Sequence, residues 1–324
     1  MDYEIIYRKK KMAERLVCFF ALLTILLSTS GCPSDVQKPA ESVGTEQNKI
    51  VSSGIEQDKA DTNDLEPKWA TYFHEKCAGI LGKFVDDDGM VDYKGLKSET
   101  LKLRALLEEF NNLDPNEYRS WRSEDRIAFW INVYNLHKLN IVLANYPVQA
   151  SSRFLRVLWG PMDIRHIEDK ITGYKFLVMD EEFTFRRIEN RFFRGEFNDP
   201  RIFLAITDAC LSSPPLRNEP YYGYKLNEQL DDQARKFLSN PLAFRVDVPR
   251  HRVYLSAVFE AGRFGGEFLK KYAIDRKFKD HPPVTRAVLN FVTGYVSEYD
   301  VSFLEKGSYS VKYMRYDWQI NDGS

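Results

Sequence analysis

The chain has 324 residues, of which 44% are hydrophobic and 14% aromatic, so it can bury a sizeable core as one large domain or two small ones. Its 46 basic and 47 acidic residues nearly cancel, which leaves no global positive field to hold a nucleic acid. Five histidines, and four cysteines without a CxxC pair, argue against a His-rich metal site, a zinc ribbon and a thioredoxin-type site. We therefore expect no metal and no cofactor.

Residues 1–32 have the order of segments found in a bacterial lipoprotein leader. A basic stretch comes first, and the apolar run from Leu16 to Leu27 that follows is too short to span a bilayer as a mature helix. Small residues then precede Cys32, which resembles a lipobox, where the cysteine is diacylated and becomes the mature N-terminus. Thr29 stands where a lipobox usually has Leu, and an uncleaved signal anchor or an ordinary secretory peptide also fits this pattern. We predict a lipoprotein signal peptide over residues 1–32 with lipidation at Cys32.

Residues 33–67 contain no aromatic residue and are rich in Ser, Glu, Gln, Asp and Lys. Such a segment cannot bury enough apolar surface to offset the entropy lost on ordering it. We therefore predict a flexible tether that joins the membrane anchor at Cys32 to a globular domain over residues 68–324. The domain is expected in the cell envelope, facing the periplasm or the cell exterior.

The start of the predicted domain contains an amphipathic helix and a turn. The helical stripe over residues 69–81 includes Cys77, which we expect to be a small apolar core residue. The acidic run Asp86-Asp87-Asp88-Gly89 resembles part of a calcium loop. However, the first and twelfth ligand positions fall on Phe84 and Gly95, which carry no carboxylate. We reject an EF-hand and predict a tight turn.

A long helix is predicted from Ser123 to Ala144, with Ser123 as its cap and Pro147 beyond its end. It is apolar nearly all round, which is typical of a central buried helix. Asn132 and Asn135 are three residues apart and share a face, and buried amides must find partners. Either these amides bond to nearby loops and fix the fold, or they form the polar floor of a pocket.

The remaining elements are short strands and helices. Hairpins are predicted at 175–184 and 244–255, and helices at 98–110, 185–193, 231–238 and 284–295. Few strands among many helices, without βαβ alternation, predict an α+β fold: a helix-rich single globular domain with short β-hairpins. The strip 311–320 is expected to dock onto this domain because Trp318 is too large an apolar group to leave exposed. The GxGxxG, Walker A, HExxH and GxSxG signatures are absent.

Five sequence blocks carry a resemblance to a known family. They are FWINVYN at 129–135, FNDPRI at 197–202, SSPPLRNEPY at 212–221, LDDQARKFL at 230–238 and YDWQIN at 316–321. In this order they resemble the family called domain of unknown function 547, and the resemblance covers roughly residues 69–321. Since that family has no assigned reaction, the resemblance brings no activity to this chain.

The central block departs from the pattern of that family. Where the family typically has His, Cys, Ser and a second Cys, this chain has the residues Phe203, Asp208, Cys210 and Ser213. A thiol nucleophile needs a base or an environment that lowers its pKa, and Asp208 would raise the pKa because like charges oppose ionisation. We expect Cys210 to be a buried core or pocket residue. The alternative is a nucleophile whose histidine partner lies far away in sequence.

The polar residues around these blocks define a candidate pocket. We expect the turn that contains Cys210 and ends at Pro214-Pro215 to form a pocket wall. Arg201 and Arg217 either offer bidentate donors to an anionic ligand or form ion pairs within the protein. The residues of the candidate pocket are Asn132, Asn135, Asp208, Cys210, Ser213 and Arg217.

Two functions remain open from the sequence. The first is a non-catalytic, membrane-tethered envelope domain that binds an unknown protein or small-molecule ligand. It is favoured because reactive side chains of the family pattern are replaced while its other blocks are kept. The second is a divergent cysteine-dependent hydrolase or acyl-transferase that uses Cys210. The partners that we predict are the membrane and this unidentified ligand, with no nucleic acid.

Overall fold

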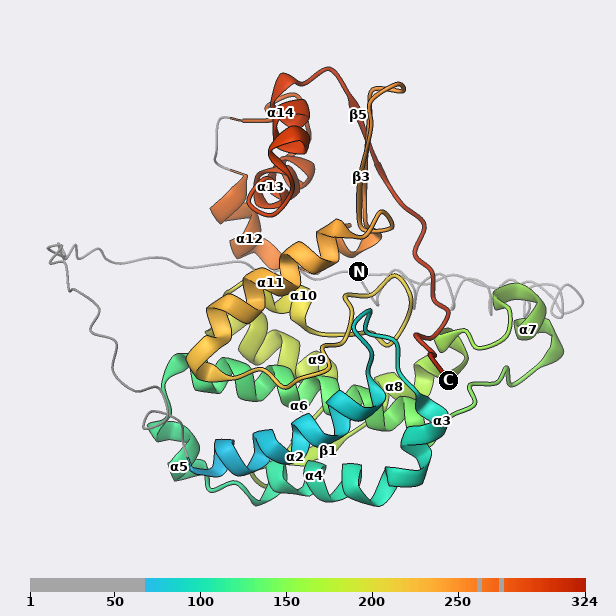
Figure 1. Cartoon of the computed structure of the whole chain (residues 1–324), viewed down its shortest axis with the longest axis vertical. Helices are drawn as coiled ribbons and strands as arrows, with labels where there is room; N and C mark the ends of the chain where they lie inside the picture. The colour runs from blue at the N-terminus through green and yellow to red at the C-terminus, as the bar shows by residue number, and fades with distance from the viewer. Residues whose placement is uncertain (1–67, 261–263, 274–276) are drawn as a thin grey trace, which may run out of the picture. The chain divides into compact units, whose positions relative to one another are not determined.

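The computed structural model describes residues 68–324 except 261–263 and 274–276 (Figure 1). Most of this part is helical, and its strands form two small sheets, so the predicted helix-rich α+β fold is confirmed. The predicted leader, lipidation residue Cys32 and tether lie outside the described residues. Within the described ranges, no helix has both the length and the apolar character needed to cross a bilayer.

The predicted helices and hairpins are present in the predicted order, and further short elements that the sequence did not predict lie between them. The helices are α2 (Lys68–Phe84), α3 (Tyr93–Leu96), α4 (Thr100–Asn112), α5 (Pro115–Ser120), α6 (Ser123–Ala144), α7 (Arg153–Trp159), α8 (Glu168–Thr172), α9 (Phe185–Ile188), α10 (Ile202–Ala205), α11 (Leu226–Ser239), α12 (Gly265–Tyr272), α13 (Pro283–Val292) and α14 (Glu298–Lys306). A π-helix, η4 (Glu189–Glu196), continues α9, and the short 3-10 helices are η2 (Lys97–Glu99), η3 (Ile164–Ile167), η5 (Gly223–Lys225) and η6 (Ala257–Phe259). The strands are β1 (Phe176–Val178), β2 (Glu181–Phe183), β3 (Phe244–Asp247), β4 (Arg252–Leu255) and β5 (Ser310–Tyr313).

Both predicted hairpins are present, and the second gains a third strand. β1 pairs antiparallel with β2, and β3 pairs antiparallel with β4. β5 pairs with β4 in parallel, which requires a long crossover, and the chain makes it through α12, α13 and α14. The C-terminal strip therefore docks onto the domain, as the sequence predicts.

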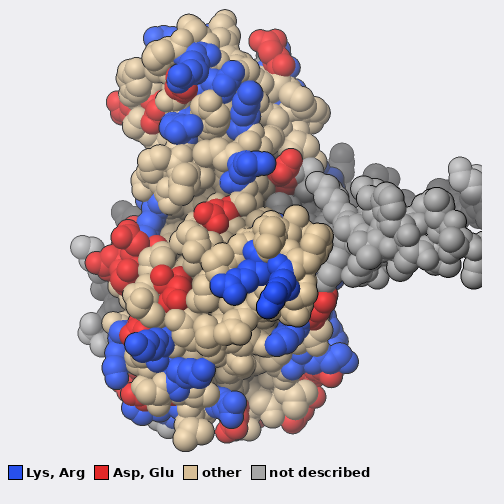
Figure 2. Space-filling model, turned by 90° about the vertical axis from the view of Figure 1, so that its right-hand side faces the viewer, with Lys and Arg blue, Asp and Glu red and all other residues tan. Residues whose placement is uncertain are grey.

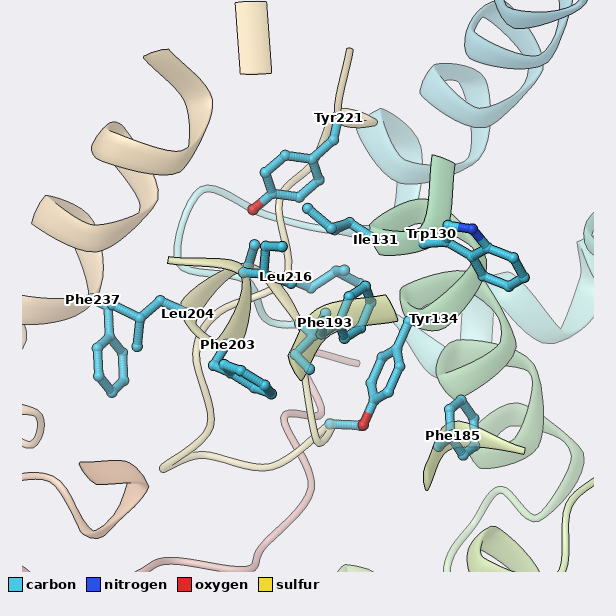
Figure 3. Close-up of a cluster of buried hydrophobic side chains, with 14 of the residues drawn as sticks. Trp130, Ile131, Tyr134, Phe185, Phe193, Phe203, Leu204, Leu216, Tyr221 and Phe237 are labelled. Atoms are coloured by element: carbon cyan, nitrogen blue, oxygen red, sulfur yellow. The ribbon is translucent and has the colours of Figure 1, made fainter. Parts of the chain in front are cut away.

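Helix α6 lies at the centre of the core and is covered by α4, α8, α9 and α11. The ring of Trp130 stacks on Phe192 with centroids 3.9 Å apart. Farther along the helix, Tyr134 packs edge-on against Phe185 at 4.9 Å. Figure 3 shows Trp130 and Tyr134 within the buried aromatic cluster, which also includes Phe193. These contacts agree with the prediction that a helix apolar on all sides is buried on all sides.

The first turn of α6 differs from the prediction in one detail. Ser123 is the first helical residue and not the cap, because the cap position is held by Arg122 in an extended conformation. The side chain of Arg122 reaches forward to Asp125, with Nε 2.9 Å from Oδ2. Gly223 packs directly on this carboxylate, since a Cβ there would lie 1.7 Å from Oδ1 of Asp125. The beginning of α6 is therefore held by an ion pair and a close glycine contact.

The two amides of α6 fix two separate loops to the helix. Asn132 Nδ2 donates to the carbonyl oxygen of Tyr221 at 2.8 Å, and the N–H of Tyr221 donates back to Asn132 Oδ1 at 2.9 Å. Asn135 Nδ2 donates to the carbonyl oxygen of Ala205 at 2.9 Å, and its Oδ1 accepts from the N–H of Thr207 at 3.0 Å. Each buried amide thus pairs with backbone in both directions, as a neighbouring strand would. The sequence left open whether these amides fix loops to the helix or form the floor of a pocket. The contacts agree with the first interpretation.

The segment after β5 crosses the domain and pairs with turns from distant parts of the chain. Ile320 forms an antiparallel bridge with Cys210. Asn321 is buried, and its Oδ1 accepts a hydrogen bond from Tyr93 Oη at 3.0 Å. Trp318 is half-buried and packs against the core. The end of the chain therefore joins the N-terminal helices to the region around Cys210.

Replacing Asn132 with alanine should lower the free energy of unfolding by about 2–3 kcal/mol, because the N–H and carbonyl of Tyr221 lose their partner in a buried place. Urea unfolding measures this change. The matched control is Asn112→Ala at the exposed end of α4, which should change the stability by no more than about 0.5 kcal/mol. Equal effects of the two substitutions would contradict the structural role of Asn132.

Deleting residues 311–324 should lower the free energy of unfolding by at least about 3 kcal/mol, because it removes β5, the buried Ile320 and the half-buried Trp318. Thermal unfolding followed by circular dichroism measures the loss. Removal of the exposed Ser324 alone is the control and should change the melting temperature little. An unshifted melting temperature in the long deletion would show that the segment does not dock.

Candidate functional site

Cys210 lies in a turn between α10 and Pro214-Pro215. Thr207 Oγ1 accepts a hydrogen bond from the N–H of Ala209 at 2.9 Å, and Ser213 Oγ donates to the carbonyl oxygen of Cys210 at 2.8 Å. Ala209 has a φ of 59°, in the left-handed region, so the chain reverses here. A thiolate is commonly stabilised at the N-terminus of a helix, and this turn provides no such helix at Cys210.

The thiol of Cys210 is enclosed and held in its protonated form. Its residue is 2% exposed, and Sγ donates to Tyr316 Oη at 3.4 Å. Tyr316 Oη in turn donates to Asp208 Oδ2 at 3.4 Å. Burial, together with the nearby carboxylate of Asp208, raises the pKa of the Cys210 thiol to about 12. The expectations that Cys210 is buried and that Asp208 raises its pKa agree with this geometry.

A buried lysine that sequence reasoning missed completes this cluster. Lys138 is 1% exposed, and its Nζ lies 3.6 Å from Asp208 Oδ1. The same ammonium lies 4.4 Å from the ring centroid of Phe185 and 5.3 Å from that of Tyr134. A buried ammonium needs an opposite charge, and the aromatic faces add favourable electrostatics. Asp208 therefore does more than perturb the thiol, because it also balances the charge of Lys138.

The sequence did contain a signal for this lysine. Asn132, Asn135 and Lys138 follow one another at intervals of three residues in a helix whose middle is otherwise mostly apolar. Residues at this spacing lie near one face, which makes them candidates for a shared polar surface. The signal was missed because a lysine is usually assigned to the solvent.

We call Lys138, Asp208, Cys210, Ser213 and Tyr316 the Cys210 cluster. It is connected to α6 twice, through the ion pair of Lys138 and through Asn135, which accepts from Thr207 N–H. Thr207 Oγ1 lies 3.1 Å from Ser213 Oγ, which brings Ser213 into the same network. The arrangement stabilises one buried charge pair and one neutral thiol. Its chemistry is that of a structural polar core.

The C-terminal segment covers the Cys210 cluster. Leu211 N–H donates to the carbonyl oxygen of Gln319 at 2.8 Å, and Ser212 N–H donates to that of Asp317 at 3.2 Å. Asp317 N–H donates back to Ser212 Oγ at 2.8 Å. Since Tyr316 belongs to this segment, the residue that bonds the thiol arrives together with the cover. A reagent can reach Cys210 only if this segment moves.

The residues predicted to line one pocket do not lie together. Asp208, Cys210 and Ser213 share the cluster, and Asn135 is linked to it through the backbone of Thr207. Asn132 borders a separate hollow of about 10 Å³, which has room for about one water molecule. In the described part of the chain, no group of three or more His, Cys, Asp or Glu side chains is placed to hold a metal ion.

The two arginines proposed as ligand donors form ion pairs. Arg217 Nη2 lies 2.7 Å from Glu219 Oε1, and its Nη1 bonds the carboxylate of Asp232. Arg201 bonds Asp199 through several nitrogens and Asp231 through Nη1 at 2.9 Å. These pairs connect the loops on either side of the Cys210 turn to α11. The ion-pair alternative therefore describes both residues.

Native Cys210 should be alkylated by iodoacetamide much more slowly than free cysteine, because a pKa of about 12 leaves about one thiol in 10⁵ ionised at pH 7. Mass spectrometry of the Cys210 peptide measures the rate. Unfolding in urea should restore the rate of an ordinary cysteine. Cys210→Ala should fold and lose at most about 1–2 kcal/mol of stability. Native alkylation faster than free cysteine would contradict the structural role and favour a nucleophile.

Comparisons with known proteins give one result. Residues 118–238 match the model of the family described as "Protein of unknown function, DUF547". No curated protein and no solved structure matches the chain. The matched segment runs from within α5 into α11, and so includes the buried helix α6 and the turn that holds Cys210. The chain therefore carries, at residues 118–238, a domain of the DUF547 family of proteins of unknown function.

Proposed function

We propose that this protein is a lipid-tethered component of the cell envelope whose domain is a non-catalytic module that binds a protein or small-molecule ligand. The main support for a non-catalytic role is that Cys210 is buried and that its thiol has a raised pKa. The one thiol within the DUF547 segment is neutral, 2% exposed and covered by the C-terminal segment. A cysteine nucleophile needs the opposite of each property.

The electrostatics of the cluster favour the structural role over catalysis. Reactive cysteines have pKa values of about 3.5–7.5, whereas burial and Asp208 raise the pKa of Cys210 to about 12. The charge of Lys138 and the hydrogen bond with Tyr316 act in the other direction, but burial and Asp208 outweigh them. Lys138 forms an ion pair with Asp208 and does not generate a thiolate.

The alternative function is a divergent cysteine-dependent hydrolase or acyl-transferase. It requires the C-terminal segment to withdraw from Leu211 and Ser212, and it requires Cys210 to lose its proton beside a carboxylate. Withdrawal would also remove Tyr316, which lowers the pKa of the thiol through its hydrogen bond. Withdrawal would also expose the thiol and so reduce the burial that is the main cause of its raised pKa, while the carboxylate of Asp208 would still oppose its ionisation. The alkylation rate of Cys210 separates the two functions.

A ligand of the proposed module would find a hollow within the DUF547 segment. It has a volume of about 340 Å³ and lies between α5, α6 and the π-helix η4, with the buried rings of Trp130 and Phe192 behind its lining. Arg126 bonds Glu196 at its edge, and Arg191 bonds Glu181. The exposed residues of its lining are largely charged, among them Arg119, Arg191 and Glu196, which favours a polar ligand or a polar peptide side chain. This hollow is separate from the Cys210 cluster, so binding does not depend on the thiol.

Membrane attachment in this proposal rests on the leader. Cys32→Ser should release the protein from the membrane fraction, or leave it uncleaved with its leader still attached, because acylation requires the thiol. Fractionation and the intact mass of the purified protein measure this. Cys18→Ser is the matched control, since Cys18 lies inside the apolar run, and it should leave attachment unchanged. Unchanged mass and unchanged membrane partition in Cys32→Ser would refute lipidation.

A further inference from the structure

Helix α7 presents apolar side chains to the solvent. Phe154 is 69% exposed, Val157 is 87% exposed and Leu158 is 58% exposed. These three residues follow the spacing of one helical face, and none of the side chains of α7 is buried. In a soluble domain, a contiguous apolar face of this kind indicates contact with another surface.

The helix is held in place at both ends. Ser152 Oγ accepts from the N–H of Leu155 at 3.2 Å and caps the first turn. Gly160 ends the helix with a φ of 83°, and His166 Nε2 lies 2.7 Å from its carbonyl oxygen. The guanidinium of Arg165 lies 5.0 Å from the ring centroid of Trp159. The domain therefore presents the apolar face of α7 in a defined direction and does not bury it.

The charges within α7 and its flanking residues are of one sign. Residues 148–162 include Arg153 and Arg156, both exposed, and no acidic residue. The next acid along the chain, Asp163, is buried and paired with Arg165. Figure 2 looks onto the side of the molecule that carries α7 in Figure 1, where a group of basic side chains lies within uncharged surface, with acidic side chains farther out. The surface that covers this face should therefore be apolar beneath a negatively charged layer.

We propose that α7 contacts an anionic lipid bilayer, with Phe154, Val157 and Leu158 at the boundary of headgroups and acyl chains. The apolar residues supply burial, and Arg153 and Arg156 meet lipid phosphates while their aliphatic stems follow the apolar surface. Trp159, the last residue of α7, is partly exposed beside Arg165, and tryptophan is favoured at a membrane interface. A lipid surface fits better than a protein groove, because the charge is uniform and the contact needs no matching shape.

A contact made by three apolar and two basic side chains binds a membrane only weakly by itself. It would strengthen attachment that a lipid anchor already provides. The inference thus rests on the proposed tether for its biological setting. Its evidence, however, comes from residues 152–166 and is independent of Cys32. With both contacts, the domain lies against the membrane in one orientation and does not rotate freely on its tether.

The test places an environment-sensitive fluorophore at Val157→Cys in the full-length chain, with Cys18 and Cys32 replaced by serine. The control label is placed at Leu101→Cys, which is 79% exposed on α4. Both proteins are mixed with vesicles of phosphatidylglycerol and phosphatidylethanolamine that contain nitroxide-labelled lipids. The label at 157 should shift to shorter wavelength and be quenched severalfold more than the label at 101. Because the comparison is between two labels at equal bound fraction, attachment through the leader does not affect it.

Charge reversal adds a second readout. Arg153→Glu with Arg156→Glu should abolish the quenching at 157, whereas Arg245→Glu with Arg250→Glu on the β3–β4 hairpin should not. Quenching at 157 should also weaken with added salt. Equal quenching at 157 and 101, no quenching at either, or a blue shift at 157 without lipid would each overturn the proposal, the last by indicating a protein contact. A failed Cys32→Ser experiment would refute the tether and leave this result unaffected.

Discussion

The structure depends on α6 being buried on every side, because each polar side chain of a buried helix must then find a partner inside the protein. Asn132 pairs with the backbone before η5, and Asn135 pairs with the backbone after α10. Lys138 reaches Asp208 in the turn that follows. Three polar residues on one helix thus position most of the chain between α10 and α11. This explains why two amides and a lysine are tolerated among the apolar side chains that make up most of the buried surface of this helix.

The C-terminal segment supplies the remaining contacts that hold the Cys210 turn in place. It adds β5 to the sheet of β3 and β4, brings Tyr316 to Asp208 and Cys210, and places Asn321 against Tyr93. The cluster is therefore built from three parts of the chain that are far apart in sequence. The contacts that stabilise the fold are the same contacts that enclose the thiol and keep it protonated. The contacts that stabilise this cluster and the contacts that bury the thiol are therefore the same.

Much of the fold could be predicted because its signals are local. The apolar pattern of α6, the alternating strands of both hairpins and the prolines beyond helix ends are all readable within a few residues. Two predictions for α6 differ from the structure, one for its cap and one for the exposure of a lysine. Ser123 was assigned as a cap, but Arg122 takes that position and its side chain pairs with Asp125. Lys138 was passed over because lysine is most often exposed, and its burial depends on Asp208, which lies seventy residues away along the chain.

The class of fold and the central helix could be predicted from the sequence, since periodicity and residue type act over short distances. The sequence also favoured a buried Cys210, but for Asn135 and Arg217 it left two interpretations open. The pairing of Arg217 with Glu219 and Asp232, and the exposure of Phe154 and Val157, became known only from the three-dimensional structure. The partner of a charge, or the cover of an apolar face, is set by which distant segments of the chain meet. That choice depends on the packing of the whole domain and leaves no periodic trace in the sequence.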